Sequence, residues 1–359
     1  MERVETVIVG GGAMGLAAAW HLAHRGRRVL LLERETIGHR GGASHGSTRN
    51  FNQAYSDPRY VAALVEARRH WAELESECGA TLLDTVGVVN HGTNPAFGDV
   101  QAALSAAGIP AEFLPPEEAQ RRWPGIRFDS PVLYTPQSGR LRADAALSAL
   151  RGGAVAHGAE VRQDTRVTNL TVLGDTRVRV TTENSEFESR HVIVTAGAWT
   201  QKLIGDLVPL PALVVTQEQP AHFAARDPLE RWPGFNHYPT PDDRSYDYWP
   251  SQIYGMQAPG VGVKVGWHGV GPVTDPDARS FASEPVQLAA LRRYVREWLP
   301  GADPDNAAEI SCTYTTTPDT NFVLKRFGPV TVGAGFSGHG FKFAPAVGRI
   351  LADLADGDL

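Results

Sequence analysis

The first 33 residues constrain the fold more strongly than any other part of the chain. A short apolar strand is predicted at residues 7–9, and the motif Gly10-x-Gly12-x-x-Gly15 follows it directly. A helix and a second buried strand come next, and that strand ends at Glu33. The order strand, glycine motif, helix, strand and acidic residue is typical of a βαβ unit that binds an adenine dinucleotide.

Each part of this unit has a physical role. One glycine permits the tight turn, the next lets the backbone approach a pyrophosphate, and the third lets the helix pack on the strand. The free N–H groups at the start of the helix carry a partial positive charge that favours phosphates. Glu33 lies where its carboxylate can accept hydrogen bonds from a ribose. The alternative is a glycine-rich turn in an α/β domain that binds no nucleotide.

Composition narrows the class of protein. The chain has 359 residues, which suits two closely packed domains. Its net charge is −6 and it has no basic block, which argues against nucleic acid as a partner. No apolar run reaches the ~18 residues of a membrane span, and Cys78 and Cys312 are the only cysteines, as expected in a reducing compartment. We therefore expect a cytoplasmic monomer that acts on a small molecule, without a membrane or nucleic-acid partner.

The two ends of the chain resemble each other around a dissimilar middle. Buried strands followed by glycine-rich turns lead us to assign residues 1–84, 143–208 and 307–359 to a nucleotide-binding domain. Residues 85–142 and 209–306 are assigned to a substrate domain, much of it rich in proline, tyrosine and tryptophan. The predicted fold class is α/β, with a two-domain α+β organisation. A Rossmann-like domain is interleaved with a substrate domain built mostly from an antiparallel β-sheet.

A second glycine-rich segment, residues 333–340, lies between a predicted strand and a helix predicted at residues 341–354. Its backbone N–H groups and the helix dipole are suited to an anion. A flavin meets this requirement, because its two-electron-reduced ring carries negative charge that preoriented donors and a nearby cation stabilise. Lys342 is a candidate for that cation or for binding a substrate carboxylate. The alternative is a surface lysine at the start of a helix.

Five segments in order along the chain resemble the monomeric sarcosine oxidase and N-methyltryptophan oxidase family, which belongs to the D-amino-acid-oxidase-like flavoproteins. They are the N-terminal glycine motif, Ser44-His45-Gly46-Ser47-Thr48-Arg49, Val263-Lys264-Val265-Gly266-Trp267-His268, Ser311-Cys312-Thr313-Tyr314 and Phe336-Ser337-Gly338-His339-Gly340-Phe341-Lys342-Phe343. The resemblance covers essentially the whole chain. It implies bound FAD and oxidation of a secondary amine to an imine, with O2 reduced to hydrogen peroxide. The imine then hydrolyses in water.

The resemblance also implies roles for single residues, and it implies no metal. Cys312 matches a cysteine that bonds covalently to the flavin ring. Lys264 matches a lysine that promotes the reaction with oxygen, and Lys342 matches a lysine that holds the substrate carboxylate. The residues implied to bind FAD are Gly10, Gly12, Ala13, Met14, Gly15, Glu33, Arg34, Ser44, His45, Thr48, Arg49, Val167, Ala196, Gly197, Trp199, Cys312, Gly338, His339, Gly340 and Lys342. The residues implied to act in catalysis or to line the substrate cavity are Thr48, Arg49, Asn52, Tyr254, Lys264, His268, Tyr314 and Lys342.

Physical arguments support the assignment of Lys264. Oxygen reduction begins by forming an anion in a dry site, and a fixed cation lowers that barrier. A lysine on an apolar strand is unfavourable unless it is used or paired, although a strand lysine that points to solvent is an alternative. Without the resemblance, Cys312 would be an ordinary half-buried cysteine and His268 a structural histidine. Tyr254 and Tyr314 would be core aromatics.

Amine oxidation needs a neutral nitrogen, because a protonated amine has no lone pair. An aromatic cavity that removes water from the ammonium group lowers its pKa without a dedicated base. We therefore predict no single general base. Substitution of His268 is expected to weaken flavin reduction without abolishing it.

The chain departs from the family pattern at one position that bears on the substrate. Relatives that oxidise sarcosine carry an arginine three residues after the one matching Arg49, and this chain has Asn52 there. An amide forms weaker, uncharged hydrogen bonds than a guanidinium that grips a carboxylate in bidentate fashion. A larger or less acidic secondary amine is therefore expected, such as a cyclic amino acid or a biosynthetic intermediate. Residues 234–238 and 243–249 are expected to contribute to a lid over the substrate.

Three other functions are considered. A flavin dehydrogenase would pass electrons to a protein or quinone, but Lys264 favours oxygen. An enzyme of this superfold that acts on modified tRNA bases would need clustered basic residues, which the chain lacks. A flavin-binding protein without catalytic activity would hold FAD that no amine reduces.

Overall fold

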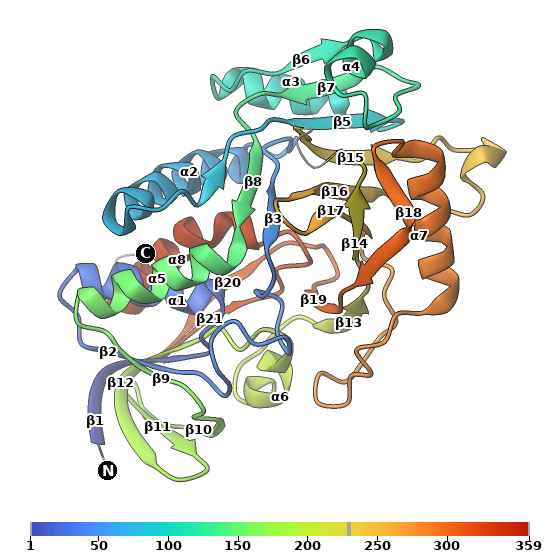
Figure 1. The fold of residues 1–359 in the computed structure, drawn as a ribbon. Helices are drawn as coiled ribbons and strands as arrows, with labels where there is room; N and C mark the ends of the chain where they lie inside the picture. The colour runs from blue at the N-terminus through green and yellow to red at the C-terminus, as the bar shows by residue number, and fades with distance from the viewer. Residues whose placement is uncertain (1, 228–230, 358–359) are drawn as a thin grey trace.

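The computed structural model describes residues 2–227 and 231–357. Two large β-sheets form the framework, and helices pack against both of them (Figure 1). The first, which we name the nucleotide sheet, has the order β10-β11-β12-β1-β2-β9, with β21 joined to β12 and β20 joined to β21. The second, which we name the substrate sheet, has the order β18-β14-β17-β16-β15-β5-β7-β6.

The nucleotide sheet is parallel around its central strand, β1 (Glu2–Val9). β1 pairs on one side with β2 (Val29–Leu32) and on the other with β12 (Glu186–Val194). β9 (Glu160–Arg162) and β21 (Val330–Ala334) extend the parallel pairing beyond them. Every residue of β2 and β21 is buried, as expected for strands covered on both faces. The antiparallel edge strands are β10 (Val167–Gly174), β11 (Arg177–Thr182) and β20 (Val323–Phe327).

Four helices form one layer against the nucleotide sheet. They are α1 (Ala13–His24), α2 (Pro58–Cys78), α5 (Ala143–Ala156) and α8 (Ala344–Asp356), which lie together in Figure 1. α1 and α8 cross closely, because a Cβ atom at Gly348 would lie 2.6 Å from the Ala17 Cβ. The helix predicted at residues 341–354 differs at its start. Phe341–Phe343 form a 3-10 turn (η3), and α8 begins only afterwards, with Pro345 in its first turn.

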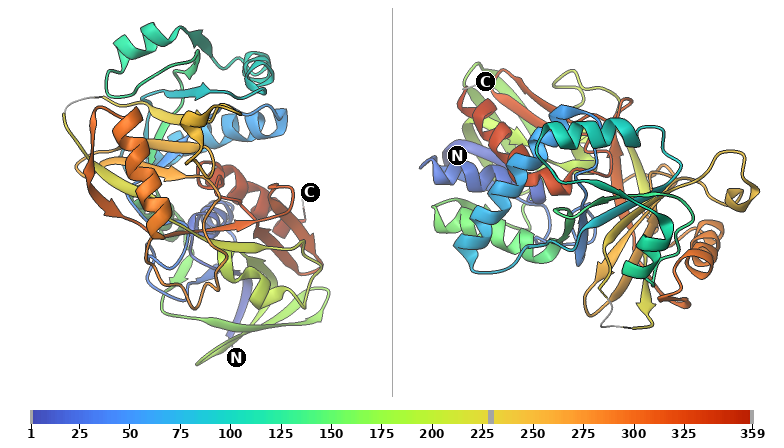
Figure 2. Two further views of the ribbon diagram at one scale, coloured as in Figure 1. Left: turned by 90° about the vertical axis from the view of Figure 1, so that its right-hand side faces the viewer. Right: turned by 90° about the horizontal axis from the view of Figure 1, so that it is seen from above.

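The substrate sheet is mostly antiparallel, with the pair β15 and β5 parallel. α7 (Pro285–Trp298) packs on its outer face, at the side of the molecule opposite to α1, α5 and α8 (Figure 2). The strands are β5 (Val88–Gly92), β6 (Glu112–Leu114), β7 (Val132–Thr135), β14 (Ala221–Ala225), β15 (Gly234–Tyr238), β16 (Ile253–Ala258), β17 (Gly262–Trp267) and β18 (Ala302–Glu309).

Smaller sheets join the two large ones, because the chain passes between them several times. One contains β3 (Thr48–Phe51), β4 (Leu83–Asp84) and β8 (Gly139–Arg142), and another pairs β13 (Val214–Glu218) with β19 (Cys312–Thr316). The remaining helices are α3 (Phe97–Ala106), α4 (Pro116–Arg122), η1 (Gly197–Trp199), α6 (Thr200–Ile204) and η2 (Arg244–Tyr246). The predicted fold class is confirmed, while the domain boundaries stay a prediction. In the described residues, no helix has both the length and the apolar character required to cross a bilayer.

The predicted lid is wrong for both of its segments. Residues 234–238 form β15, which lies inside the substrate sheet between β5 and β16. Residues 243–249 pack on the outer face of that sheet, where the rings of Tyr246 and Trp249 lie 5.8 and 6.2 Å from the Trp298 ring of α7. Phe235, Tyr246 and Trp249 therefore belong to the core beneath α7, while Tyr238 lines the cavity from within the sheet and not from a lid.

Candidate active site

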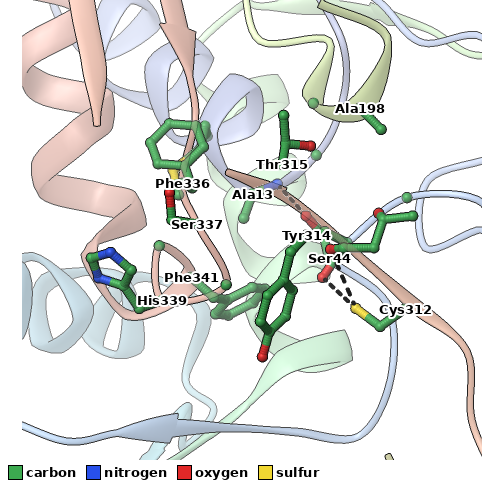
Figure 3. A pocket seen from close by; sticks show the side chains of 18 of the residues that line it. Ala13, Ser44, Ala198, Cys312, Tyr314, Thr315, Phe336, Ser337, His339 and Phe341 are labelled. Atoms are coloured by element: carbon green, nitrogen blue, oxygen red, sulfur yellow. Dashed lines mark hydrogen bonds between the residues drawn. The ribbon is translucent and has the colours of Figure 1, made fainter. Parts of the chain in front are cut away.

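One long cavity of about 720 Å³ is lined from both large sheets. Every residue predicted to bind the cofactor or the substrate lines it, except Gly15 and Thr48. The walls come from the turn before α1, the loop at residues 38–45, strands β16, β17 and β19, and the glycine-rich segment 335–340 with the 3-10 turn after it. In Figure 3, the Cys312 side chain of β19 points toward Ser44 while the Tyr314 ring points away from it, and the loop with Ser337 and His339 lies across from them. The volume falls within the usual range of cofactor and ligand cavities.

The glycine-rich turn before α1 leaves the N-terminus of that helix exposed to the cavity. Gly10 has φ +104°, and a Cβ atom there would lie 2.5 Å from the Thr195 carbonyl oxygen. A Cβ atom at Gly15 would lie 1.9 Å from the Gly10 carbonyl oxygen, so Gly15 serves the packing of the helix against the strand and not the cavity wall. No side chain caps α1 at Gly12, and Ala13 N–H donates to Ser44 Oγ at 3.1 Å (Figure 3). The start of α1 therefore presents backbone donors to an anion.

Glu33 ends β2 with a buried and fixed carboxylate. Its Oε2 accepts a hydrogen bond from Gly11 N–H at 2.6 Å, and its Oε1 accepts one from Glu35 N–H at 3.0 Å. The glycine-rich turn before α1, which would bind the pyrophosphate, therefore also orients Glu33, which would bind the ribose. This set of helix N-terminus, acid and long cavity fits an adenine dinucleotide.

The region around Cys312 is polar and carries a cation. Cys312 Sγ lies 3.9 Å from the Ala43 carbonyl oxygen, across the cavity wall from β19. The neighbouring Ser311 Oγ accepts a hydrogen bond from the Arg279 guanidinium at 2.8 Å, and Arg279 also donates to the Gly41 carbonyl oxygen at 2.6 Å. Sequence reasoning missed Arg279, because it lies in a loop without a motif and meets Ser311 only in the folded chain.

Lys264 is buried at the cavity, so the alternative of a solvent-facing strand lysine is wrong. Its Nζ donates to the Thr48 carbonyl oxygen at 3.5 Å, and Arg49 donates to the same oxygen at 2.9 Å. Arg49 also donates to the carbonyl oxygens of Ala43 and His45. Burial and the nearby Arg49 charge lower the pKa of Lys264 to about 7. Thr48 contributes its carbonyl group to this cluster, while its buried hydroxyl has no partner in the described part of the chain.

Lys342 is also buried, which excludes the alternative of a surface lysine. Its Nζ donates to the His339 carbonyl oxygen at 2.9 Å and lies 5.2 Å from the centre of the Tyr55 ring. Burial lowers the pKa of Lys342 to about 7. Within residues 2–227 and 231–357 no ion pair neutralises this ammonium group, so it can receive an anion from the cavity.

Neutral aromatic groups and imidazoles line the substrate side. Tyr314 Oη lies 3.3 Å from His268 Nδ1, and the Tyr254 ring lies 6.4 Å from the His268 ring. Burial, with a smaller effect of Lys342, lowers the pKa of His268 to about 4, and burial raises the pKa of Tyr254 and Tyr314. At neutral pH these groups carry no charge. The readings of His268 as a structural histidine and of the tyrosines as core aromatics do not account for their place on the cavity wall.

Asp277 lines the cavity beside Arg34, Trp199 and Lys202, and sequence reasoning missed it as well. It lies in the loop between β17 and α7, which we name the strap (residues 269–284). Its carboxylate accepts hydrogen bonds from Trp199 Nε1 at 2.7 Å, Lys202 Nζ at 2.7 Å and Arg34 at 3.2 Å. The strap thereby connects the substrate sheet to three residues of the nucleotide-binding part that line the cavity.

Comparison with known proteins assigns the chain to a family. The profile of the FAD dependent oxidoreductase (DAO) family matches residues 5–354. Monomeric sarcosine oxidase of Bacillus sp. (strain NS-129) is 33% identical over 98% of this chain and 92% of its own. Peroxisomal sarcosine oxidase of Mus musculus is 33% identical over the same shares, and N-methyl-L-tryptophan oxidase of Yersinia pestis (strain Pestoides F) is 28% identical over 98% of this chain and 94% of its own.

Solved structures agree with this assignment. The open form of NikD, described as an unusual amino acid oxidase essential for nikkomycin biosynthesis, superposes with a TM-score of 0.87 at 29% identity. The match covers 100% of this chain and 95% of NikD. L-proline dehydrogenase from P. horikoshii shares the fold, with a TM-score of 0.86 at 22% identity and coverage of 99% and 94%. The chain therefore belongs to the FAD-dependent oxidoreductase family of the sarcosine oxidases and is an FAD-dependent enzyme.

Proposed function

We propose that the protein oxidises the C–N bond of a secondary amine, an N-methyl or cyclic amino acid, to an imine while O2 is reduced to hydrogen peroxide. The observation that carries the proposal is the pair Lys264 and Lys342, two buried lysines on the walls of one cavity, neither of which forms an ion pair within residues 2–227 and 231–357. The names of the relatives, sarcosine oxidases and N-methyl-L-tryptophan oxidase, support the substrate class. The name of the monomeric relative supports a monomer, and we place the enzyme in the cytoplasm.

FAD, when bound, supplies the acceptor for two electrons from the amine. The protein's own groups bind and orient the substrate. Lys342 would pair with the substrate carboxylate, which fixes the position of the neighbouring carbon and nitrogen. Tyr254, Tyr314 and His268 offer a surface without charge, and this surface removes water from the substrate ammonium group. Its pKa falls, the proton leaves to solvent, and no side chain is needed as a general base.

The oxygen reaction is assigned to the cluster of Lys264 and Arg49. Reduction of O2 creates negative charge in a site of low dielectric constant, where a fixed positive charge is most effective. Both cations are held on the Thr48 carbonyl group at the cavity wall, so no reorganisation is required when the anion forms. Passing electrons to another acceptor would need no such cluster.

We also propose that FAD is bound covalently through Cys312. The thiol is half-buried, lines the cavity and lies beside the Arg279–Ser311 contact. Acid precipitation is expected to leave the yellow colour in the protein pellet. Cys312→Ser should release it into solution, and colour that stays in solution with the unmodified protein would contradict the covalent bond.

The first test is anaerobic bleaching of the flavin with sarcosine, N-methyl aromatic amino acids, L-proline, L-pipecolate, a fructosyl amino acid and glycine. Secondary amines are expected to bleach it, and glycine, a primary amine, is not. Admission of air should then restore the colour with one hydrogen peroxide per flavin. Bleaching without peroxide would identify a dehydrogenase. No bleaching in protein that dithionite still reduces would refute amine oxidation.

A further inference from the structure

A row of side chains crosses the substrate sheet on the face that lines the cavity. Asn236 of β15 is the register partner of Asn90 on β5 and of Tyr254 on β16, and Tyr254 is in turn opposite Gly266 on β17. Asn236 and Tyr254 line the cavity. The residues one step further along each strand must point the other way. They are His91, His237, Ile253 and Trp267, which lie among the aromatic residues under α7 or stack with each other.

Gly266 gives the Tyr254 ring its place in this row. A Cβ atom at Gly266 would lie 2.8 Å from both Cζ and Oη of Tyr254. The hydroxyl end of Tyr254 therefore occupies the space that a side chain at position 266 would fill.

The orientation of the amides follows from their partners. Asn52 Oδ1 accepts a hydrogen bond from Ala54 N–H at 3.0 Å, so Asn52 Nδ2 must point to Asn90 Oδ1, at 3.1 Å. Asn236 Nδ2 donates to the same oxygen at 2.9 Å. Asn236 Oδ1 is then left facing away from this cluster, and no hydrogen bond reaches it within residues 2–227 and 231–357.

A second amide oxygen lacks a donor beside it. Asn50 Oδ1 is buried without a hydrogen-bond partner in the described chain and lies 3.3 Å from the position of a Cβ atom at Gly234. Gly234 and Asn236 are two residues apart on β15, so both lie on the same face. Asn50 Oδ1 is buried, so Asn236 Oδ1 is the amide acceptor that this part of the wall offers to a ligand. A buried acceptor without a donor is unfavourable, and a ligand N–H or O–H group would relieve it.

Cations are placed elsewhere in the cavity. The Arg49 guanidinium donates to three carbonyl oxygens near β3, and Lys264 donates to one of them. Lys342 lies over the Tyr55 ring and is free for one carboxylate. A second carboxylate would meet amide oxygens and be repelled.

We propose that Asn236 is a specificity-determining residue, whose Oδ1 selects secondary amino acids that carry one carboxylate and a hydrogen-bond donor on the side chain. Such donors are a hydroxyl or an amide N–H group. The assignment rests on the proposed amine oxidation and names the substrate class within it. Asn236 and Lys342 line the same cavity, so one small amino acid can meet both groups.

The test compares three substrates of similar shape: N-methyl-L-asparagine, N-methyl-L-leucine and N-methyl-L-aspartate. With the unmodified holoenzyme, kcat/KM for reduction of the flavin is expected to be at least about tenfold higher for the asparagine derivative than for either of the others. In Asn236→Leu, the ratio of asparagine to leucine derivative should fall to about one or below. Most of the change should appear in KM, because the lost contact binds substrate and transition state alike.

Asn169→Leu is the matched control, because it makes the same change on an exposed strand of the nucleotide sheet. It should keep the ratios of the unmodified enzyme. Equal kcat/KM for the asparagine and leucine derivatives in the unmodified enzyme would overturn the assignment of Asn236 while leaving amine oxidation intact. If no secondary amine reduces the flavin, the proposed function is overturned, and this inference with it.

Discussion

At the scale of single residues, Asn52 decides how a small acid can be held. Its amide is committed to Ala54 and Asn90 and brings no charge to the cavity. Asn52→Arg adds a guanidinium that can grip a carboxylate, so kcat/KM for sarcosine should rise by about tenfold or more. Asn52→Gln lengthens the side chain without charge and serves as the control. Steady-state peroxide formation measures both variants, and an equal gain in the two would refute the role of charge.

Lys342 is expected to make substrate binding weaker as the pH rises above about 7. Its pKa of about 7 means that the group is positive below pH 7 and neutral above it, and only the charged form attracts a carboxylate. The ratio of kcat/KM between the unmodified enzyme and Lys342→Met should be constant below pH 7 and fall by up to about tenfold per pH unit above it. Taking the ratio removes the titration of the amine itself. A substrate without a carboxylate, such as N-methylbenzylamine, should show no such fall.

His268 tests the absence of a general base. Burial keeps its imidazole neutral, and Tyr314 Oη is 3.3 Å from its Nδ1. His268→Asn keeps a polar group there and should slow anaerobic flavin reduction by about tenfold or less, since it alters the cavity without removing a required proton acceptor. Stopped-flow reduction measures this rate. A loss of 10²–10⁴-fold, the usual contribution of a general base, would show that the imidazole takes the proton.

At the scale of elements, local signals predicted the strands and helices whose neighbours lie close in the sequence. β1, α1 and β2 follow one another within 33 residues, and their apolar runs and glycine motif are complete without the rest of the chain. β15 was instead expected to be a lid. Its Asn236 and His237 are polar on both faces, because one faces the cavity and the other stacks on His91 of β5. The alternation that marks a half-buried strand is therefore missing, and one of its two partner strands, β5, lies far away in sequence.

The stacked pair His91 and His237, on neighbouring strands β5 and β15, predicts sensitivity to acid. Their ring centres are 3.8 Å apart, and His91 has no hydrogen-bond partner at either nitrogen in the described residues. Burial lowers the pKa of His91 to about 3, whereas the unfolded imidazole has a pKa near 6.5. Between these values the unfolded chain binds a proton that the folded chain does not. The free energy of unfolding therefore falls by about 1.4 kcal/mol per pH unit as the pH drops below about 6.5.

His91→Leu removes this contribution. The melting temperature of the variant relative to the unmodified protein should be higher at pH 5.0 than at pH 7.5. His157→Leu, which removes an exposed imidazole, should show no such difference. Thermal unfolding by circular dichroism at the two pH values measures both, and parallel shifts in the two variants would exclude a role of the buried pair.

At the scale of the whole molecule, the candidate site is built by segments that no sequence motif connects. The family segments indicated Lys264, Cys312 and Lys342, each of which lines the cavity. Arg279, Asp277 and Asn90 were not indicated, because their positions depend on how the strap and the substrate sheet meet the nucleotide-binding part. A loop of polar residues has the same sequence character whether it crosses a cofactor cavity or faces water.

The strap makes a prediction about retention of FAD that belongs to the molecule as a whole. Within the strap, the Asp277 carboxylate accepts hydrogen bonds from Arg34, Trp199 and Lys202. All four residues line the cavity, so we expect their contacts to slow the release of FAD. In a Cys312→Ser background, where the proposed covalent bond is absent, Asp277→Asn should therefore speed FAD release several-fold, because the amide loses the ion pair and one of its two acceptor oxygens.

Release is measured as recovery of flavin fluorescence after dilution of the holoprotein. Asp305→Asn is the control. It breaks an exposed ion pair between Asp305 on β18 and Arg296 on α7, neither of which lines the cavity. It should leave the release rate unchanged. If Asp277→Asn also leaves it unchanged, FAD is held by the nucleotide-binding part alone. The contacts of the strap would then stabilise only the interleaved fold, and cofactor binding and sheet docking would be independent of each other.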